Sequence, residues 1–193
     1  MPMGVTCTNR EGQVYHLHTG KTKAGKPRWF MSTKSVGELA DAIPEGYEIW
    51  EKPENAQVFL RKIITPTVTE AEVQLIRDLA RRKASTRYTI VDVRGGTIVV
   101  HAADDNLDAR SRIFEGFGDP DPAGTRRFLE QQLQYHPMLR FELEDETDRL
   151  FSASRWCFLG SIDDWFLLDG GPLAALAAKY IPHIGAESFY ELM

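Results

Sequence analysis

The strongest constraint on the fold lies in residues 88–102, where apolar side chains alternate on both sides of Gly95-Gly96. Two consecutive glycines are typical of a two-residue hairpin turn, because both central positions of a type I′ turn take a positive φ. This turn pairs Val93 with Ile98, and the alternation then makes one face of the hairpin wholly aliphatic. Such a face must be buried, so the rest of the chain must supply more sheet and the helices that cover it.

Other patterned segments meet this requirement. Residues 139–144, 150–159 and 165–168 have the composition of strands, and residues 170–182 predict a helix rich in small side chains. The sequence therefore predicts the α+β class. We expect a small N-terminal β-hairpin module, residues 1–64, followed by an α+β domain, residues 65–193, with an antiparallel sheet of about five strands covered by helices. The two parts can equally form one compact unit.

The N-terminal module reads as two β-hairpins around a short helix. Residues 13–18 and 28–32 are strand-like, and Gly25 and Pro27 between them suit a chain reversal. A second strand pair is predicted over residues 48–51 and 57–63, and residues 35–42 predict the short helix.

The clearest helix signal follows this module. Thr69 and Glu72 have the spacing of a capping box, and Val68 and Val73 occupy the two positions of a hydrophobic staple. A helix is therefore expected to begin at this point, with its basic residues in the last turn. Farther along, residues 104–122 read as a loop, and Asp121 is expected to cap a helix that ends near Tyr135 and buries Phe128, Leu129 and Leu133.

Composition excludes several classes of protein. The chain has 193 residues, 42% of them hydrophobic, which is enough apolar surface for a packed core. No apolar run approaches the roughly 18 to 20 residues of a membrane-spanning helix, and the first residues lack the pattern of a signal peptide. We therefore expect a cytoplasmic protein with no membrane partner, whose Cys7 and Cys157 are reduced thiols.

Charge is distributed unevenly along the chain. The net charge of −5 argues against a protein that coats nucleic acid through its overall field. Residues 19–34 nevertheless contain five cations and no acid. The candidate partner-binding residues lie in this segment, and they are Lys21, Lys23, Lys26, Arg28 and Trp29.

This cationic segment has two interpretations. Lysines on a loop could meet phosphates while Trp29 or Tyr15 stacks on an unpaired base. Alternatively, the lysines protect an exposed strand edge and the aromatic side chains lie in the core. Because the rest of the chain repels phosphate, we favour a protein partner or self-association, and we keep nucleic acid as the alternative.

No motif for a catalytic nucleophile, a phosphate-binding loop, a dinucleotide or a zinc site occurs in the chain. We therefore assign no catalytic residue, no metal ligand and no cofactor, and expect a binding protein. The alternative function is a metal-dependent hydrolase or nuclease that uses clustered carboxylates. The acids considered for it are Asp104, Asp105, Asp108, Glu142, Glu144, Asp145, Glu146 and Asp148.

Three weaker features remain. Cys7, His16 and His18 could share a zinc ion, although a surface histidine pair fits better. The hairpin register brings Asp92 and His101 to one side of the sheet, as in a carboxylate-oriented general base. Finally, residues 156–159 and 165–168 hold eight large apolar side chains, too many for one face, so at least one of Trp156 and Trp165 should be partly exposed.

Overall fold

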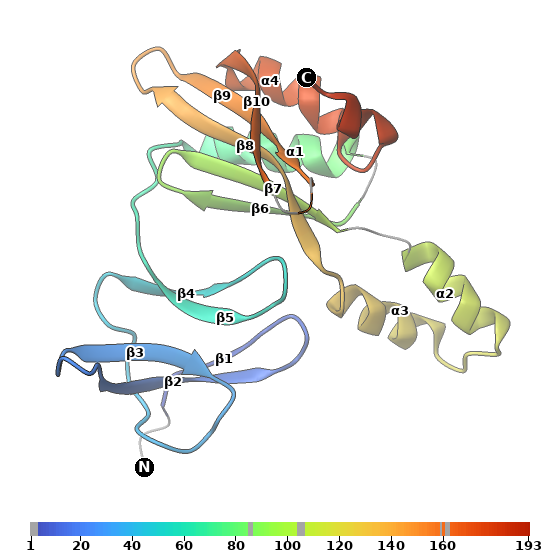
Figure 1. The fold of residues 1–193 in the computed structure, drawn as a ribbon. Coiled ribbons are helices and arrows are strands. Elements are labelled where there is room, and N and C mark those ends of the chain that lie inside the picture. The colour runs from blue at the N-terminus through green and yellow to red at the C-terminus, as the bar shows by residue number, and fades with distance from the viewer. Residues whose placement is uncertain (1–3, 85–86, 104–106, 159, 161–162) are drawn as a thin grey trace. The chain divides into compact units, whose positions relative to one another are not determined.

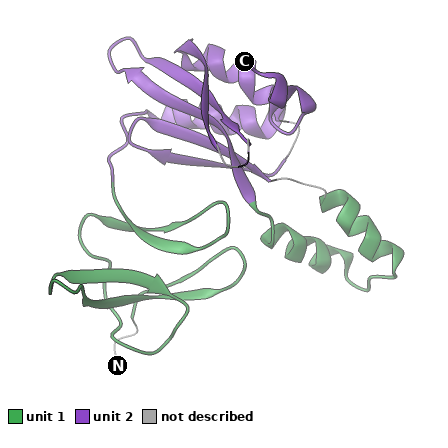
Figure 2. Ribbon diagram, in the orientation of Figure 1, with its two compact units in different colours: residues 1–63, 106–134 green, residues 64–105, 135–193 purple. Residues whose placement is uncertain are grey.

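The computed structural model describes residues 4–193 except for residues 85–86, 104–106, 159 and 161–162. The chain divides into two compact units, coloured separately in Figure 2. Unit 1 comprises Met1–Ile63 and Asn106–Gln134, and unit 2 comprises Ile64–Asp105 and Tyr135–Met193.

Unit 1 contains two small antiparallel sheets. Strands β1 (Thr6–Thr8), β2 (Val14–Lys21) and β3 (Pro27–Ser32) pair in the order β1-β2-β3. Strands β4 (Tyr47–Glu51) and β5 (Val58–Lys62) form the second sheet. Both predicted hairpins are therefore confirmed. Their small core includes Leu17, Ala56 and Val58, all of which are buried.

The short helix predicted over residues 35–42 is wrong. This segment is bound along strand β2, where Thr19 N–H donates to the Glu38 carbonyl and Ala40 N–H donates to the Leu17 carbonyl. Leu39 forms an isolated bridge with His18, and Gly37 takes a φ of 123° beside the His18 ring. Backbone pairing with a neighbouring strand thus replaces the local helical preference.

Unit 1 also contains the helices α2 (Leu107–Gly116) and α3 (Pro122–Gln131), which contact each other. The loop predicted over residues 104–122 is therefore wrong for the described part of that range. Helix α3 begins as predicted, because the Asp121 side chain accepts a hydrogen bond from Gly124 N–H. It ends at Gln131 rather than near Tyr135, and Phe128 is 59% exposed instead of buried.

Unit 2 contains the main sheet, drawn in Figure 1. Among the described residues, five antiparallel strands pair in the order β10-β9-β8-β7-β6. They are β6 (Thr89–Arg94), β7 (Thr97–Ala103), β8 (Tyr135–Asp145), β9 (Leu150–Cys157) and β10 (Asp164–Pro172). The predicted α+β class and antiparallel sheet are confirmed. The predicted register is confirmed too, since Val93 pairs with Ile98 across Gly95-Gly96.

One face of this sheet carries the core of unit 2. Helices α1 (Glu70–Lys83) and α4 (Leu173–Tyr180) lie on the same side of the sheet, followed by the short helices η1 (Ile181–His183) and η2 (Glu187–Glu191) (Figure 1). Ile76, Phe141 and Phe189 are fully buried members of one hydrophobic cluster between sheet and helices. This cluster buries the aliphatic face of the hairpin, as the alternating pattern required.

The predicted start of helix α1 is confirmed. Glu72 N–H donates to the Thr69 hydroxyl at 3.3 Å, and Thr69 N–H donates to the Glu72 carboxylate at 2.7 Å. Val68 and Val73 are both buried, as a hydrophobic staple requires. The capping box therefore satisfies backbone donors that the first turn leaves without a helical partner.

Replacement of Thr69 by Ala is expected to lower the free energy of unfolding by about 1 kcal/mol, because one capping acceptor is lost. Thermal and urea unfolding measure this change. Thr65→Ala is the control, since Thr65 is exposed and has no side-chain hydrogen bond among the described residues. An equal midpoint for the two variants would contradict the capping role.

Candidate partner-binding surface

The cationic segment forms the hairpin of strands β2 and β3. Its turn is closed by Thr22, whose N–H donates to the Lys26 carbonyl at 2.9 Å and whose hydroxyl accepts from Lys26 N–H at 3.1 Å. Gly25 takes a φ of 77°, which a residue with a side chain adopts only with strain. A threonine and a glycine at these positions thus hold Lys23 and Lys26 on a tight, exposed turn.

All five candidate residues are exposed. Trp29 is 37% exposed, and neighbouring Phe30 is 36% exposed. Lys21, Lys23, Lys26 and Arg28 form no ion pair among the described residues, and residues 19–34 contain no acid that could neutralise them. Tyr15, the other aromatic side chain considered for stacking, is buried. The hairpin therefore presents uncompensated positive charge.

Strand alternation places the candidate residues on two faces. Thr19 pairs with Trp29, so Trp29 shares its face with Lys21. Gly20 pairs with Arg28 and His18 pairs with Phe30, so Arg28 lies on the opposite face. The sequence grouped these side chains into one site, whereas a flat partner on either face would reach only part of the set.

On the Arg28 face, three side chains are stacked. The Arg28 guanidinium carbon lies 5.0 Å from the Phe30 ring centroid, and the Phe30 and His18 rings are stacked with centroids 5.2 Å apart. The His18 Nε2 atom lies 2.9 Å from the Lys34 carbonyl oxygen. Phe30 already has two stacking partners, so Trp29 is the exposed aromatic side chain of the hairpin for which the described residues provide no ring contact.

Both faces of the β2–β3 hairpin meet at the outer edge of strand β3. The turn bond at Thr22 and the register direct the N–H groups of Trp29 and Met31 away from β2. Pro27, which has no N–H, begins the strand, as proline does on edge strands. Strand β3 contacts β5, but within the described part of the chain its only ladder partner is β2.

The three candidate zinc ligands Cys7, His16 and His18 are separated by strand alternation. Thr6 pairs with His16 and Cys7 pairs with Tyr15, so Cys7 lies on the face opposite His16 and His18. His18 is buried rather than at the surface, which corrects the expected surface pair. Burial, together with the nearby Glu51 carboxylate, raises the pKa of the Cys7 thiol. Cys7 and Cys157 are both free thiols, as expected.

The acidic side chains of the β8–β9 hairpin make local contacts. Glu142 forms an ion pair with Arg140 at 2.8 Å, and Glu144 accepts a hydrogen bond from the Ser152 hydroxyl at 2.6 Å. Asp145 accepts from two backbone N–H groups of its own turn. Within the described residues no three metal-ligating side chains gather, while Asp104 and Asp105 lie outside the described residues.

The paired tryptophans lie on the sheet face opposite helices α1 and α4. Trp156 pairs with Trp165, and their rings meet edge to face with centroids 5.1 Å apart. The Arg140 guanidinium carbon lies 4.7 Å from the Trp165 centroid. Both indoles are half-buried, so the expectation of partial exposure is confirmed. Leu159 lies outside the described residues.

The predicted placement of Asp92 and His101 on one side of the sheet is also confirmed, since Asp92 pairs with Val99 and His101 pairs with Ile90. This register brings the two side chains to diagonal positions on the face that carries the tryptophans. His101 is buried. The sheet thus carries a carboxylate and a buried imidazole on one face, and no reaction is assigned to them.

Sequence reasoning missed an apolar surface on the helical hairpin α2–α3. Four large apolar side chains are exposed there: Ile113, Phe114, Phe117 and Phe128. The spacing of Phe114 and Phe117 is helical, but the glycine and proline residues that follow favoured a loop. A helix that buries only Leu107 and Ser111 lacks the wide apolar stripe by which such segments are identified.

The sequence matches no protein-family model, and comparisons with curated proteins and with solved structures found no match either. Among the described residues, no helix combines the length and apolar composition needed to cross a bilayer.

Proposed function

We propose that this chain is a binding protein whose β2–β3 hairpin takes up an acidic, extended segment of a protein partner. The partner segment adds to the outer edge of strand β3 as a further strand. The observation that carries the proposal is the division of the cations between the two faces of the hairpin. An added strand also projects its side chains to both faces, so its acids can reach Lys21 on one face and Arg28 on the other.

The positive charges of the hairpin favour addition of an acidic strand over pairing with an arbitrary strand edge. Exposed edge lysines repel a second copy of the same edge, which is how many proteins prevent aggregation. The same charges attract an acidic strand, so they select a partner rather than merely exclude one. Stacking of successive bases has less support, because Tyr15 is buried and Phe30 is stacked on His18.

The test is a fluorescence-anisotropy titration with a labelled peptide that repeats two valines and two glutamates, because adjacent glutamates in a strand project to opposite faces. We expect the wild-type protein to bind it, and to ignore a peptide that repeats two valines and two lysines. Replacement of Lys21, Lys23 and Lys26 by Ala should weaken binding about tenfold, the sum of three exposed ion pairs. The control variant replaces three exposed cations outside the hairpin: Lys62, Lys83 and Arg94.

Backbone pairing is tested with N-methylated versions of the acidic peptide. Methylation at every second residue removes the N–H groups of one edge only, so one of the two methylated registers should bind and the other should not. Equal binding of both would contradict strand addition. Tighter binding of a single-stranded oligonucleotide than of the acidic peptide, both measured in about 50 mM salt, would instead favour nucleic acid as the partner.

A further inference from the structure

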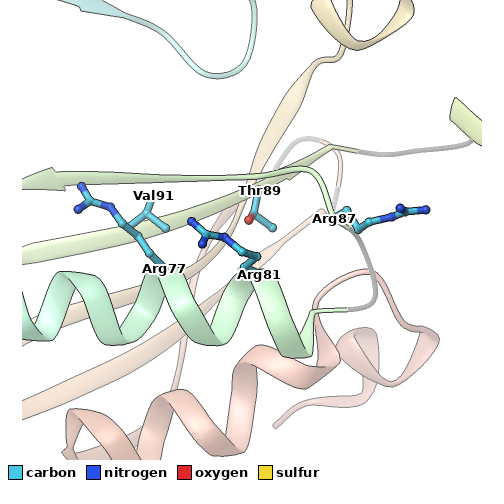
Figure 3. A pocket seen from close by; sticks show the side chains of 5 residues that line it. All are labelled: Arg77, Arg81, Arg87, Thr89 and Val91. Atoms are coloured by element: carbon cyan, nitrogen blue, oxygen red, sulfur yellow. The ribbon is translucent and has the colours of Figure 1, made fainter. Parts of the chain in front are cut away.

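A pocket in unit 2 concentrates arginine side chains. It has a volume of about 250 Å³ and lies between helix α1 and strand β6, lined by Arg77, Arg81, Arg87, Thr89 and Val91 (Figure 3). Arg77 and Arg81 both rise from α1 toward β6, with Thr89 and Val91 on the opposite wall. The Arg87 guanidinium points away from the other two in this view. Arg77 and Arg81 are therefore the two cations that face the pocket together.

Positive charge exceeds negative charge at this pocket. Arg77 and Arg81 are four residues apart on α1, a spacing at which like charges repel. Arg77 pairs with Glu70 at 2.9 Å, but that carboxylate is 81% exposed. Arg81 has no ion pair among the described residues, and Asp78 on the same helix pairs with Arg82. In a chain of net charge −5, this pair of arginines therefore has a single, largely exposed carboxylate partner and keeps a net positive charge.

Strand β6 adds donors to the same pocket. It is an edge strand of the main sheet, paired only with β7 in the described part of the chain. Ala103 N–H donates to the Tyr88 carbonyl, and the two-residue turn at Gly95-Gly96 fixes the alternation, so the N–H groups of Thr89 and Val91 face away from β7. The Thr89 hydroxyl is a further donor on that wall.

We propose that this pocket binds a small phosphate-bearing anion. The guanidinium groups of Arg77 and Arg81 hold its oxygens in charge-assisted hydrogen bonds, and the Thr89 hydroxyl and outward N–H groups of β6 donate to it. Two adjacent cations match a dianion better than a carboxylate, which carries a single charge. The pocket volume is below the roughly 300 to 1,000 Å³ of drug-sized ligand sites, so it suits a phosphate with a small substituent.

Calorimetric titration with inorganic phosphate and with glycerol phosphate tests this inference, with acetate at matched ionic strength as the comparison. The wild-type chain should bind both phosphates more tightly than acetate. Arg81→Gln should weaken phosphate binding about tenfold, the loss expected for one charge-assisted hydrogen bond. Arg82→Gln is the matched control, because Arg82 is one residue away on the same helix but pairs with Asp78 outside the pocket.

Two further measurements distinguish a site from a general salt effect. Thr89→Val keeps the shape of the side chain while removing its hydroxyl, and it should weaken phosphate binding several-fold. Arg77→Gln combined with Arg81→Gln should abolish it and leave thermal stability in chloride unchanged or higher, because the like-charge repulsion disappears. Equal affinity of Arg81→Gln, Arg82→Gln and wild type would overturn the proposal. Binding only to vesicles that contain phosphatidic acid would overturn it as well.

Discussion

Replacement of Phe141 by Ala is expected to lower the free energy of unfolding of unit 2 by about 3 to 5 kcal/mol. Phe141 is fully buried on β8, the central strand of the main sheet, and it lies between Ile98 of β7 and Ala153 of β9. Removal of the ring leaves a cavity that strands paired on both sides cannot close. Small domains are stable by only about 5 to 15 kcal/mol, so this loss is a large share of the total.

Hydrogen exchange read strand by strand measures this effect. Every residue of the cluster around Phe141 belongs to unit 2, so amide protection should fall in β6–β10 and persist in β1–β3. The control is Phe128→Ala, because Phe128 is largely exposed and its removal should change stability by less than about 0.5 kcal/mol. An equal loss of protection in both units would show that they unfold together.

The main sheet could be predicted because its signals are local. Gly95-Gly96 fixes a turn, and the turn fixes the register, so Val93 and Ile98 had to pair. The start of helix α1 was predictable for the same reason, since Thr69 and Glu72 satisfy each other within one turn. Where an element depends on distant backbone, prediction was wrong. Residues 38–40 follow β2 because of hydrogen bonds to residues about twenty positions away.

Helices α2 and α3 show a second limit. Phe128 was expected to be buried because large apolar side chains usually face a core. In the structure it is exposed, as is Phe117. Burial depends on what packs against a helix, and the sequence of the helix alone does not contain that information.

The candidate surface was predictable in part. Five cations without an acid are visible in the sequence, and the structure shows that they are exposed. The division between faces depends on the register of β2 and β3, which the sequence does not fix across a five-residue turn. The arginine pocket was missed, because Arg77 and Arg81 read as an ordinary polar helix face until strand β6 is placed beside them.

The second large effect is expected at Glu72, where two interactions converge on one carboxylate. It accepts from Thr69 N–H within the capping box and from the Arg149 side chain, whose Nε lies 3.0 Å away. Arg149 is 77 residues away in the chain, at the end of the turn between β8 and β9, and has a φ of 52°. Glu72→Ala should therefore lower the free energy of unfolding by about 2 kcal/mol at neutral pH, more than the loss of the Thr69 cap alone.

The same carboxylate should make stability depend on pH. Burial acts to raise the pKa of Glu72, but the hydrogen bonds from Arg149 and Thr69 outweigh it, and the pKa lies below its usual value of 4.5. The unfolded chain therefore binds a proton at higher pH than the folded chain does. The stabilisation is complete above pH 4.5 and is lost as the pH falls through the lowered pKa of the folded state.

Urea unfolding of wild type, Glu72→Gln and Arg149→Met between about pH 7 and pH 3 measures this contribution. Glutamine keeps an acceptor for the capping box but has no proton to gain, so the pH-dependent part should disappear in Glu72→Gln while part of the capping stability remains. Arg149→Met should reduce the same pH-dependent part, because the guanidinium is the main partner that favours the charged carboxylate. The variant with both changes should lose less free energy of unfolding than the two single variants lose in sum. The reason is that the interaction between Glu72 and Arg149 can be removed only once. Parallel pH profiles for wild type and Glu72→Gln would contradict the assignment of acid sensitivity to this carboxylate.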